Sequence, residues 1–192
     1  ATAEAAVQVA MEQLNRTLLG MECLVLGFGR IGKLLSNRLH GLGARVTATA
    51  RRPGDLAWIR AYGWRALETQ DLDGNLAPFG VVFNTIPSLI LNGPLLEQLP
   101  EDCVCIDLAS IQGIDQTAAE KLGLRSVWAR SLPGRLVPRT AAAGIRDAVY
   151  YTSHADRRSV GGTSLAVNPA AGLIDYYNGD RLVLINKSAT PM

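Results

Sequence analysis

The sequence has little net charge, no long hydrophobic run and no obvious targeting segment. Its 19 Lys and Arg residues and 17 Asp and Glu residues leave a formal charge of +2, which is too small to indicate binding to nucleic acid or to a membrane surface. No apolar run reaches the roughly 18 residues of a membrane-spanning helix. Residues 1–10 lack the basic start and apolar body of a signal peptide. We therefore expect a cytoplasmic protein with neither nucleic acid nor membrane as a partner.

Cysteine is also scarce, because the chain contains only Cys23, Cys103 and Cys105. All three lie in apolar, strand-like stretches, and their odd number argues against a disulfide framework. We predict buried, reduced thiols. No CxxC pair and no nearby histidine accompanies them, so we expect no metal site.

The composition is that of a folded chain. Hydrophobic residues make up 48% and charged residues 19% of the 192 positions, which is typical of globular proteins. This length allows one sizeable core, or one domain with an appendage.

The most informative stretch is an apolar strand that runs into a glycine turn and then a helix. Residues 27–32 follow the GxGxxG spacing of dinucleotide-binding turns. In that motif Gly27 makes the tight bend, Gly29 lets the backbone approach a pyrophosphate, and Gly32 lets the helix lie close to the strand. Helix amides from about Gly29 onward would point at the anion. We predict a dinucleotide site here, formed by Gly27, Phe28, Gly29, Arg30, Ile31 and Gly32; the alternative is a purely structural turn.

Short strand-like runs alternate with helical patterns along the chain, which predicts an α/β fold with a Rossmann-like, doubly wound parallel sheet. The spacing of apolar residues also predicts a leader helix over residues 3–14. Such a helix often connects two domains, and we expect its exposed face to meet a partner. The predicted strands cover residues 24–26, 44–49, 65–68, 81–83, 104–108 and 126–129.

Two further segments lie where the cofactor is expected. At the end of the second strand, NAD-binding proteins place an acidic residue that holds the ribose, whereas this chain has Thr49, Ala50, Arg51 and Arg52. Two guanidinium groups without a carboxylate suit a 2'-phosphate, so we favour NADP and keep NAD as the alternative. The fourth strand ends in Asn84, Thr85, Ile86 and Pro87, which we expect at the nicotinamide side.

Together, the motifs LVLGFGRIGKLL, TARRP, LAWIRAYGW, VVFNTIPSLIL, IDLAS and SLPGRLVPRTA resemble the nucleotide-binding domain in the A subunit of dipicolinate synthase over about residues 2–147. This resemblance implies an NADP-dependent oxidoreductase of sporulation that makes dipicolinate from a cyclic lysine-pathway intermediate. It also implies a partner, a flavoprotein-like B subunit. Leu108, Ala109 and Ser110 and the loop at residues 132–134 would then rim the cofactor cleft.

The last part of the chain resembles a different family. GGTSLAVNPAAGL and LVLINKSATP, within about residues 161–191, are similar to the end of a sirtuin, an NAD-dependent protein deacylase. The resemblance implies dinucleotide contacts at Thr163, Ser164 and Asn186. The glycine-rich start, the catalytic histidine region and the zinc cysteines of sirtuins are missing, so we do not expect deacylation. We predict a helix over residues 169–177, an Asn-Gly turn and a strand over residues 181–185.

These patterns give a predicted domain organisation and two functional hypotheses. The Rossmann domain covers residues 1–152, a charged linker residues 153–160, and an appended αβ segment residues 161–192. The first hypothesis is an oxidoreductase of the dipicolinate synthase kind. We expect its front domain to be absent, which would leave one wall of the substrate cleft missing. The alternative is therefore a non-catalytic dinucleotide-binding or interaction module, from a truncated or recombined chain. The sequence identifies no catalytic residue and does not decide between a monomer and a homo-oligomer.

Overall fold

The computed structural model describes residues 1–129, 132, 136, 138–140 and 142–146 with their side chains, and the backbone of residues 165–168, 173–178 and 181–186. The chain divides into two compact units, Ala1–Val137 and Pro138–Met192. The expected linker at residues 153–160 lies outside the described residues, so its boundaries stay a prediction.

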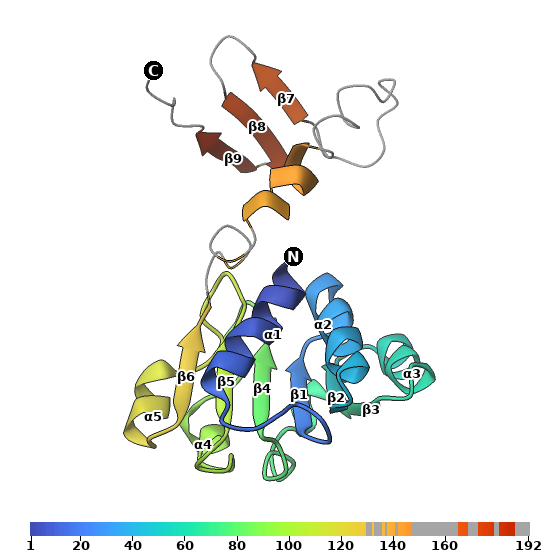
Figure 1. Ribbon diagram of the computed structural model, residues 1–192, viewed down its shortest axis with the longest axis vertical. Coiled ribbons are helices and arrows are strands. Elements are labelled where there is room, and N and C mark those ends of the chain that lie inside the picture. The colour runs from blue at the N-terminus through green and yellow to red at the C-terminus, as the bar shows by residue number, and fades with distance from the viewer. Residues whose placement is uncertain are drawn as a thin grey trace. The chain divides into compact units, whose positions relative to one another are not determined.

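The first unit contains a six-stranded parallel sheet in the order β3-β2-β1-β4-β5-β6 (Figure 1). The chain reverses its direction of travel across the sheet between β1 and β4, which makes the carboxyl ends of these two strands the expected ligand crevice. The predicted doubly wound α/β fold is confirmed, and each of its six predicted strands is present. The strands are β1 (Glu22–Leu26), β2 (Arg45–Ala50), β3 (Arg65–Glu68), β4 (Val81–Asn84), β5 (Val104–Asp107) and β6 (Arg125–Trp128).

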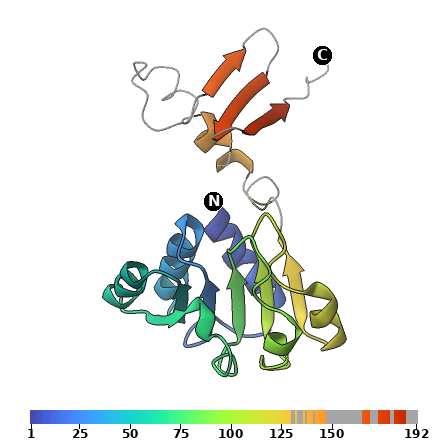
Figure 2. The same ribbon diagram turned by 180° about the vertical axis from the view of Figure 1, so that it is seen from behind.

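Helices cover both faces of this sheet. One core cluster joins the sheet to α1 (Thr2–Gln13), α2 (Arg30–Gly41) and α3 (Pro53–Ala61). The other joins it to α4 (Gly93–Leu96) and α5 (Gln116–Lys121), and a short 3-10 helix, Thr69–Asp71, follows β3. Figure 1 shows α1 and α2 in front of the sheet, and Figure 2, from the opposite side, shows α1 behind it.

The leader helix α1 is a structural part of the domain. Its alanines at positions 3, 5, 6 and 10 and its two valines are buried, and α1 contacts α2 and β5. Small side chains allow this close approach to the sheet, and Arg38 of α2 donates a hydrogen bond of 2.9 Å to Glu4. These alanines and valines of α1 therefore pack inside the unit, whereas Met11 of the same helix is exposed. Contact of α1 with a partner stays a prediction.

The three cysteines are buried and free, as predicted. Cys23 lies in β1 and the other two lie in or beside β5. No helix in the described part of the chain is both long enough and apolar enough to cross a bilayer.

The second unit contains a three-stranded antiparallel sheet, β7 (Leu165–Asn168), β8 (Leu173–Asn178) and β9 (Arg181–Asn186). The predicted strand at residues 181–185 is confirmed, but the predicted helix over residues 169–177 is wrong, because residues 173–178 form β8. Tyr176 and Tyr177 favour a strand. Asn178 pairs with Arg181, so two residues join the strands, and Asn-Gly beside such a short connection is the sequence signal of a hairpin.

Candidate functional site

The turn after β1 requires glycine at its first position. Gly27 has φ = +94°, and a Cβ atom there would lie 2.7 Å from Thr85 Oγ1 and 2.9 Å from Ile86 Cγ1. Its amide donates a hydrogen bond of 3.0 Å to Thr49 Oγ1. The bend is therefore fixed from two sides, by the end of β2 and by the segment after β4.

The other two glycines of the motif have different surroundings. A Cβ atom on Gly32 would lie 2.1 Å from the carbonyl oxygen of Gly27, so Gly32 brings α2 against the turn, as predicted. Gly29 is the N-cap of α2 and has no atom within 4 Å of its ideal Cβ position. The space in front of Gly29 is open, which is the condition for close approach of a pyrophosphate.

The start of α2 can attract an anion. No side chain caps this end of the twelve-residue helix, and its first turn contains no acidic residue. The first amides of a helix lack intrahelical acceptors and carry the positive end of the helix dipole. Within the described residues, these amides are left without a side-chain acceptor at the helix start.

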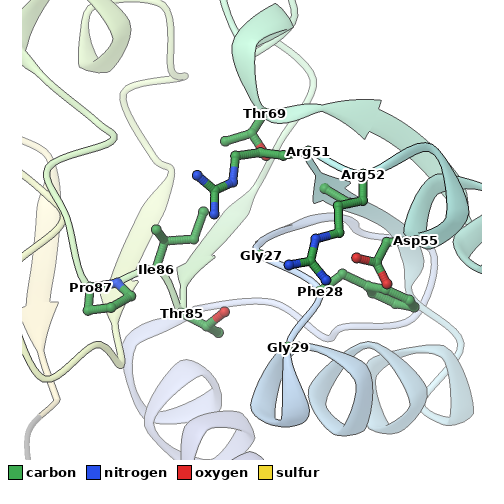
Figure 3. A pocket seen from close by; sticks show the side chains of 11 residues that line it. Gly27, Phe28, Gly29, Arg51, Arg52, Asp55, Thr69, Thr85, Ile86 and Pro87 are labelled. Atoms are coloured by element: carbon green, nitrogen blue, oxygen red, sulfur yellow. The ribbon is translucent and has the colours of Figure 1, made fainter.

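A cavity of about 300 Å³ opens beside this turn. It brings together residues from the ends of β1, β2 and β4, as expected for a crevice at the carboxyl edge of a parallel sheet. Figure 3 shows these side chains around the opening. The lining consists of Gly27, Phe28, Gly29, Ala50, Arg51, Arg52, Asp55, Thr69, Thr85, Ile86 and Pro87.

The end of β2 supplies the cations of this cavity. Arg51 and Arg52 are both exposed and line its wall. Neither has an ion-pair or hydrogen-bond partner among the described residues. Their donors are therefore free for a ligand, in the positions predicted from the sequence.

Two lining residues were not predicted from the sequence. Asp55, in the first turn of α3, places a carboxylate in the cavity, although the residues from Thr49 to Arg52 contain none. Thr69 comes from the 3-10 helix after β3, and its hydroxyl oxygen is buried without a hydrogen-bond partner. No spacing rule links either residue to the glycine motif, so only the fold reveals them.

The opposite wall comes from Thr85, Ile86 and Pro87, and their contact with the nicotinamide side stays a prediction. The Thr85 hydroxyl donates a hydrogen bond of 2.8 Å to the carbonyl oxygen of Leu26. This bond ties the wall to the end of β1. The wall therefore has a fixed position relative to the glycine turn.

Asn84 does not line the cavity, contrary to its predicted contact with the nicotinamide side. Its side chain is fully buried. The amide nitrogen donates to Ile86 O at 3.0 Å and to Asp107 Oδ1 at 2.8 Å, and the amide oxygen accepts from Ile86 N at 3.0 Å. Because both ends of the amide bind the protein itself, Asn84 supports the wall rather than facing a ligand.

Asp107 is the partner that holds Asn84 in place. Its fully buried carboxylate also accepts hydrogen bonds from the amides of Ala109, Gly113 and Ile114 at 3.1, 2.6 and 3.2 Å. Asn84 and Asp107 end neighbouring strands and are register partners, a pairing that only the fold reveals.

The remaining predicted residues do not line the cavity. Thr49 is buried and supports Gly27, while Arg30 and Ile31 belong to the first turn of α2. Leu108 packs against the core, Ala109 is buried and Ser110 is exposed. Leu132, from the expected rim loop, is also buried, but residues 133 and 134 lie outside the described residues, as do Thr163 and Ser164.

The fold and the site together define a Rossmann-type dinucleotide-binding fold. No family model matches the sequence. The chain is 35% identical over 141 residues to the A subunit of dipicolinate synthase from Bacillus subtilis, a match covering 73% of this chain and 48% of that protein. The crystal structure of the corresponding A subunit from Bacillus halodurans superimposes with a TM-score of 0.78 at 31% identity, covering 81% of this chain and 54% of the other.

The predicted resemblance to the dipicolinate synthase A subunit is thus confirmed, and the chain spans about half the length of these relatives. The apo structure of D-lactate dehydrogenase from Escherichia coli has a TM-score of 0.55 at 20% identity, over 62% of this chain and 45% of that one, and shows the fold alone.

The second resemblance is also confirmed. A 47-residue stretch is 62% identical to the NAD-dependent protein deacetylase of Clostridium tetani, covering 24% of this chain and 19% of the deacetylase. This match is too short to show a deacetylase.

Proposed function

We propose that this chain binds a nicotinamide dinucleotide, NADP in preference to NAD, as the nucleotide-binding part of an oxidoreductase like the dipicolinate synthase A subunit. The single observation that carries the proposal is one cavity that contains both the open turn at Gly27 and Gly29 and the two unpaired arginines that follow β2. The glycine turn suits a pyrophosphate, and the two arginines suit an additional phosphate.

The residues fit such a cofactor at three points. The uncapped start of α2, in front of Gly29, would hold the pyrophosphate with backbone amides. Arg51 and Arg52 would hold the 2'-phosphate, because guanidinium groups bind phosphate through paired hydrogen bonds. The Thr69 hydroxyl, which lacks a partner, would hydrogen-bond the adenosine end.

The role of the chain in the chemistry is orientation. A bound nicotinamide dinucleotide supplies hydride transfer. The wall formed by Thr85, Ile86 and Pro87 would position the nicotinamide end and shield one side of it from water. Asn84 and Asp107 would fix this wall through their hydrogen bonds to Ile86 and to each other.

One observation favours the second candidate, a module that binds the dinucleotide without turnover. Among the residues that line the cavity, the only titratable side chains are Arg51, Arg52 and Asp55, and they lie just after β2 and at the start of α3. The wall after β4 contributes no acid or base. Dipicolinate formation, the cyclic substrate, the flavoprotein-like partner, homo-oligomer formation and a cytoplasmic location stay predictions from the sequence and the resemblance.

The proposal is tested by fluorescence titration with NADPH and NADH on wild type and on Arg51→Asp. We expect wild type to prefer NADPH, and we expect the substitution to weaken NADPH binding by about ten- to hundredfold, the effect of losing a charge-assisted contact of about 1.5 to 3 kcal/mol. Arg60→Asp is the matched control, because Arg60 is exposed at the other end of α3 and lies outside the cavity lining. If wild type binds NADPH and NADH equally, and Arg51→Asp changes neither affinity, the assignment of the 2'-phosphate to these arginines is refuted.

A further inference from the structure

Three charged residues, of both signs, line the cavity and would act in opposite ways on an adenosine ribose. Arg51 and Arg52 attract a phosphate, whereas the Asp55 carboxylate repels a phosphate and accepts hydrogen bonds from hydroxyl groups. All three residues line the same cavity. Figure 3 shows Asp55 and the Arg52 guanidinium on the same side of it, with Arg51 extended toward Ile86.

Asp55 lies at the start of a helix. Arg52 is the N-cap of α3, so Asp55 is the third residue of this helix. A negative charge in the first turn is stabilised by the helix dipole. No side chain caps the helix, so the Asp55 carboxylate does not accept a capping hydrogen bond from the first amides of α3.

The oxygens of Asp55 are also free to meet a ligand. Among the described residues, Asp55 has neither a hydrogen-bond nor an ion-pair partner, and Arg52 is likewise unpaired. Because the two side chains are not locked together, each acts on whatever occupies the cavity. An unphosphorylated ribose offers two hydroxyl donors to a carboxylate, as in NAD sites.

We propose that Asp55 is a specificity-determining residue that limits the preference for a phosphorylated dinucleotide. It weakens binding of the 2'-phosphate that the arginines attract, and it provides an acceptor for the free hydroxyl groups of the unphosphorylated form. This inference rests on the proposed function, since it concerns the same site. The chain then binds both dinucleotides and discriminates between them less strongly than its two arginines alone would.

The test compares dissociation constants for NADPH and NADH between wild type and Asp55→Asn. Loss of the repulsion strengthens NADPH binding by about three- to tenfold, because a carboxylate and a phosphate in one partly solvated cavity repel each other. NADH binding weakens by about two- to fivefold, because an amide is a poorer acceptor than a carboxylate. The gain in NADPH affinity shrinks at about 0.5 M salt, because salt screens the repulsion.

Two further variants separate the charge from a structural effect. Asp55→Glu keeps the charge in the first helical turn, so its affinity ratio stays within about threefold of wild type. Glu97→Gln removes an equal charge from an exposed position outside the cavity lining, and it leaves the ratio unchanged. Thermal unfolding of each variant checks that it folds.

The outcomes distinguish this inference from the proposed function. If wild type binds NADPH and NADH but Asp55→Asn leaves their ratio unchanged, or if Glu97→Gln shifts it equally, the role of Asp55 is wrong while the proposed function stands. If wild type binds neither dinucleotide, both are wrong.

Discussion

Asn84 and Asp107 end neighbouring strands, are both fully buried, and share a hydrogen bond of 2.8 Å between amide and carboxylate. Through this pair the loop after β4 is joined to the loop after β5. Gly113 completes the contact, because a Cβ atom there would lie 2.2 Å from Asn84 Nδ2. A buried carboxylate surrounded by donors therefore supports the wall of the candidate cofactor cavity.

Removing this carboxylate should destabilise the first unit strongly. Asp107→Ala leaves the amides of Ala109, Gly113 and Ile114 and the amide of Asn84 without their acceptor. We expect a loss of about 3 to 5 kcal/mol, because each buried donor left without a partner costs about 1 to 3 kcal/mol. Chemical denaturation of wild type and variant measures this difference in the free energy of unfolding. The control is Asp102→Ala, which removes an exposed ion pair with Arg16 and should change stability by less than about 1 kcal/mol; similar losses in both variants would contradict the structural role.

The buried thiols predict a dependence of stability on pH. Burial, with a smaller contribution from the charge of Glu22, raises the pKa of Cys23 from 9.0 to about 12. Because the folded-state pKa is higher than the unfolded one, the stability from this thiol is fully present below about pH 9 and is lost as the pH rises toward about 12. Denaturation midpoints measured between about pH 8 and about pH 11 should fall more steeply in wild type than in Cys23→Ala.

The end of the chain can be removed without touching the residues that line the cavity. All residues that line the cavity lie in the unit Ala1–Val137, so truncation after Ser153 should leave the NADPH dissociation constant within about threefold of the full chain, because no lining contact is removed. Titration of both proteins measures this. A truncated chain that fails to fold would show that the remaining residues are needed by the first unit.

The sequence predicts those parts of the structure that depend on local pattern. The apolar strands and the spacing of Gly27, Gly29 and Gly32 identify the sheet and the turn, because each glycine answers a local backbone or packing requirement. The sequence identifies Arg51 and Arg52 because they directly follow the second strand, where this class of fold places residues that bind the ribose of a dinucleotide. These features need no knowledge of distant contacts.

The residues that were missed or misassigned depend on long-range packing. Asp55 and Thr69 enter the cavity from elements whose direction the sequence alone does not give. Asn84 was expected to face a ligand because polar residues at strand ends usually do so, but its partner Asp107 is 23 positions away. The error at β8 has a different cause, because a short apolar run fits either a helix or a strand.

Substitutions at Gly32 and Gly41 provide two comparisons for a substitution at Gly29, the residue in front of which the pyrophosphate is proposed to bind. Gly32→Ala places a Cβ atom 2.1 Å from the Gly27 carbonyl oxygen, so this variant should lose about 1 to 3 kcal/mol of stability through overpacking. Gly41→Ala, at the end of the same helix, meets no atom within 4 Å and should leave both stability and NADPH binding nearly unchanged.

The most direct test of the cofactor site is NADPH titration of Gly29→Ala beside a thermal unfolding measurement. The ideal Cβ position at Gly29 is free of protein atoms and its φ is −78°, so the variant should fold with a loss of no more than about 1 kcal/mol. The added methyl group occupies the space assigned to the pyrophosphate, and NADPH affinity should fall by at least about fiftyfold. A folded Gly29→Ala variant that binds NADPH as tightly as wild type would contradict the account.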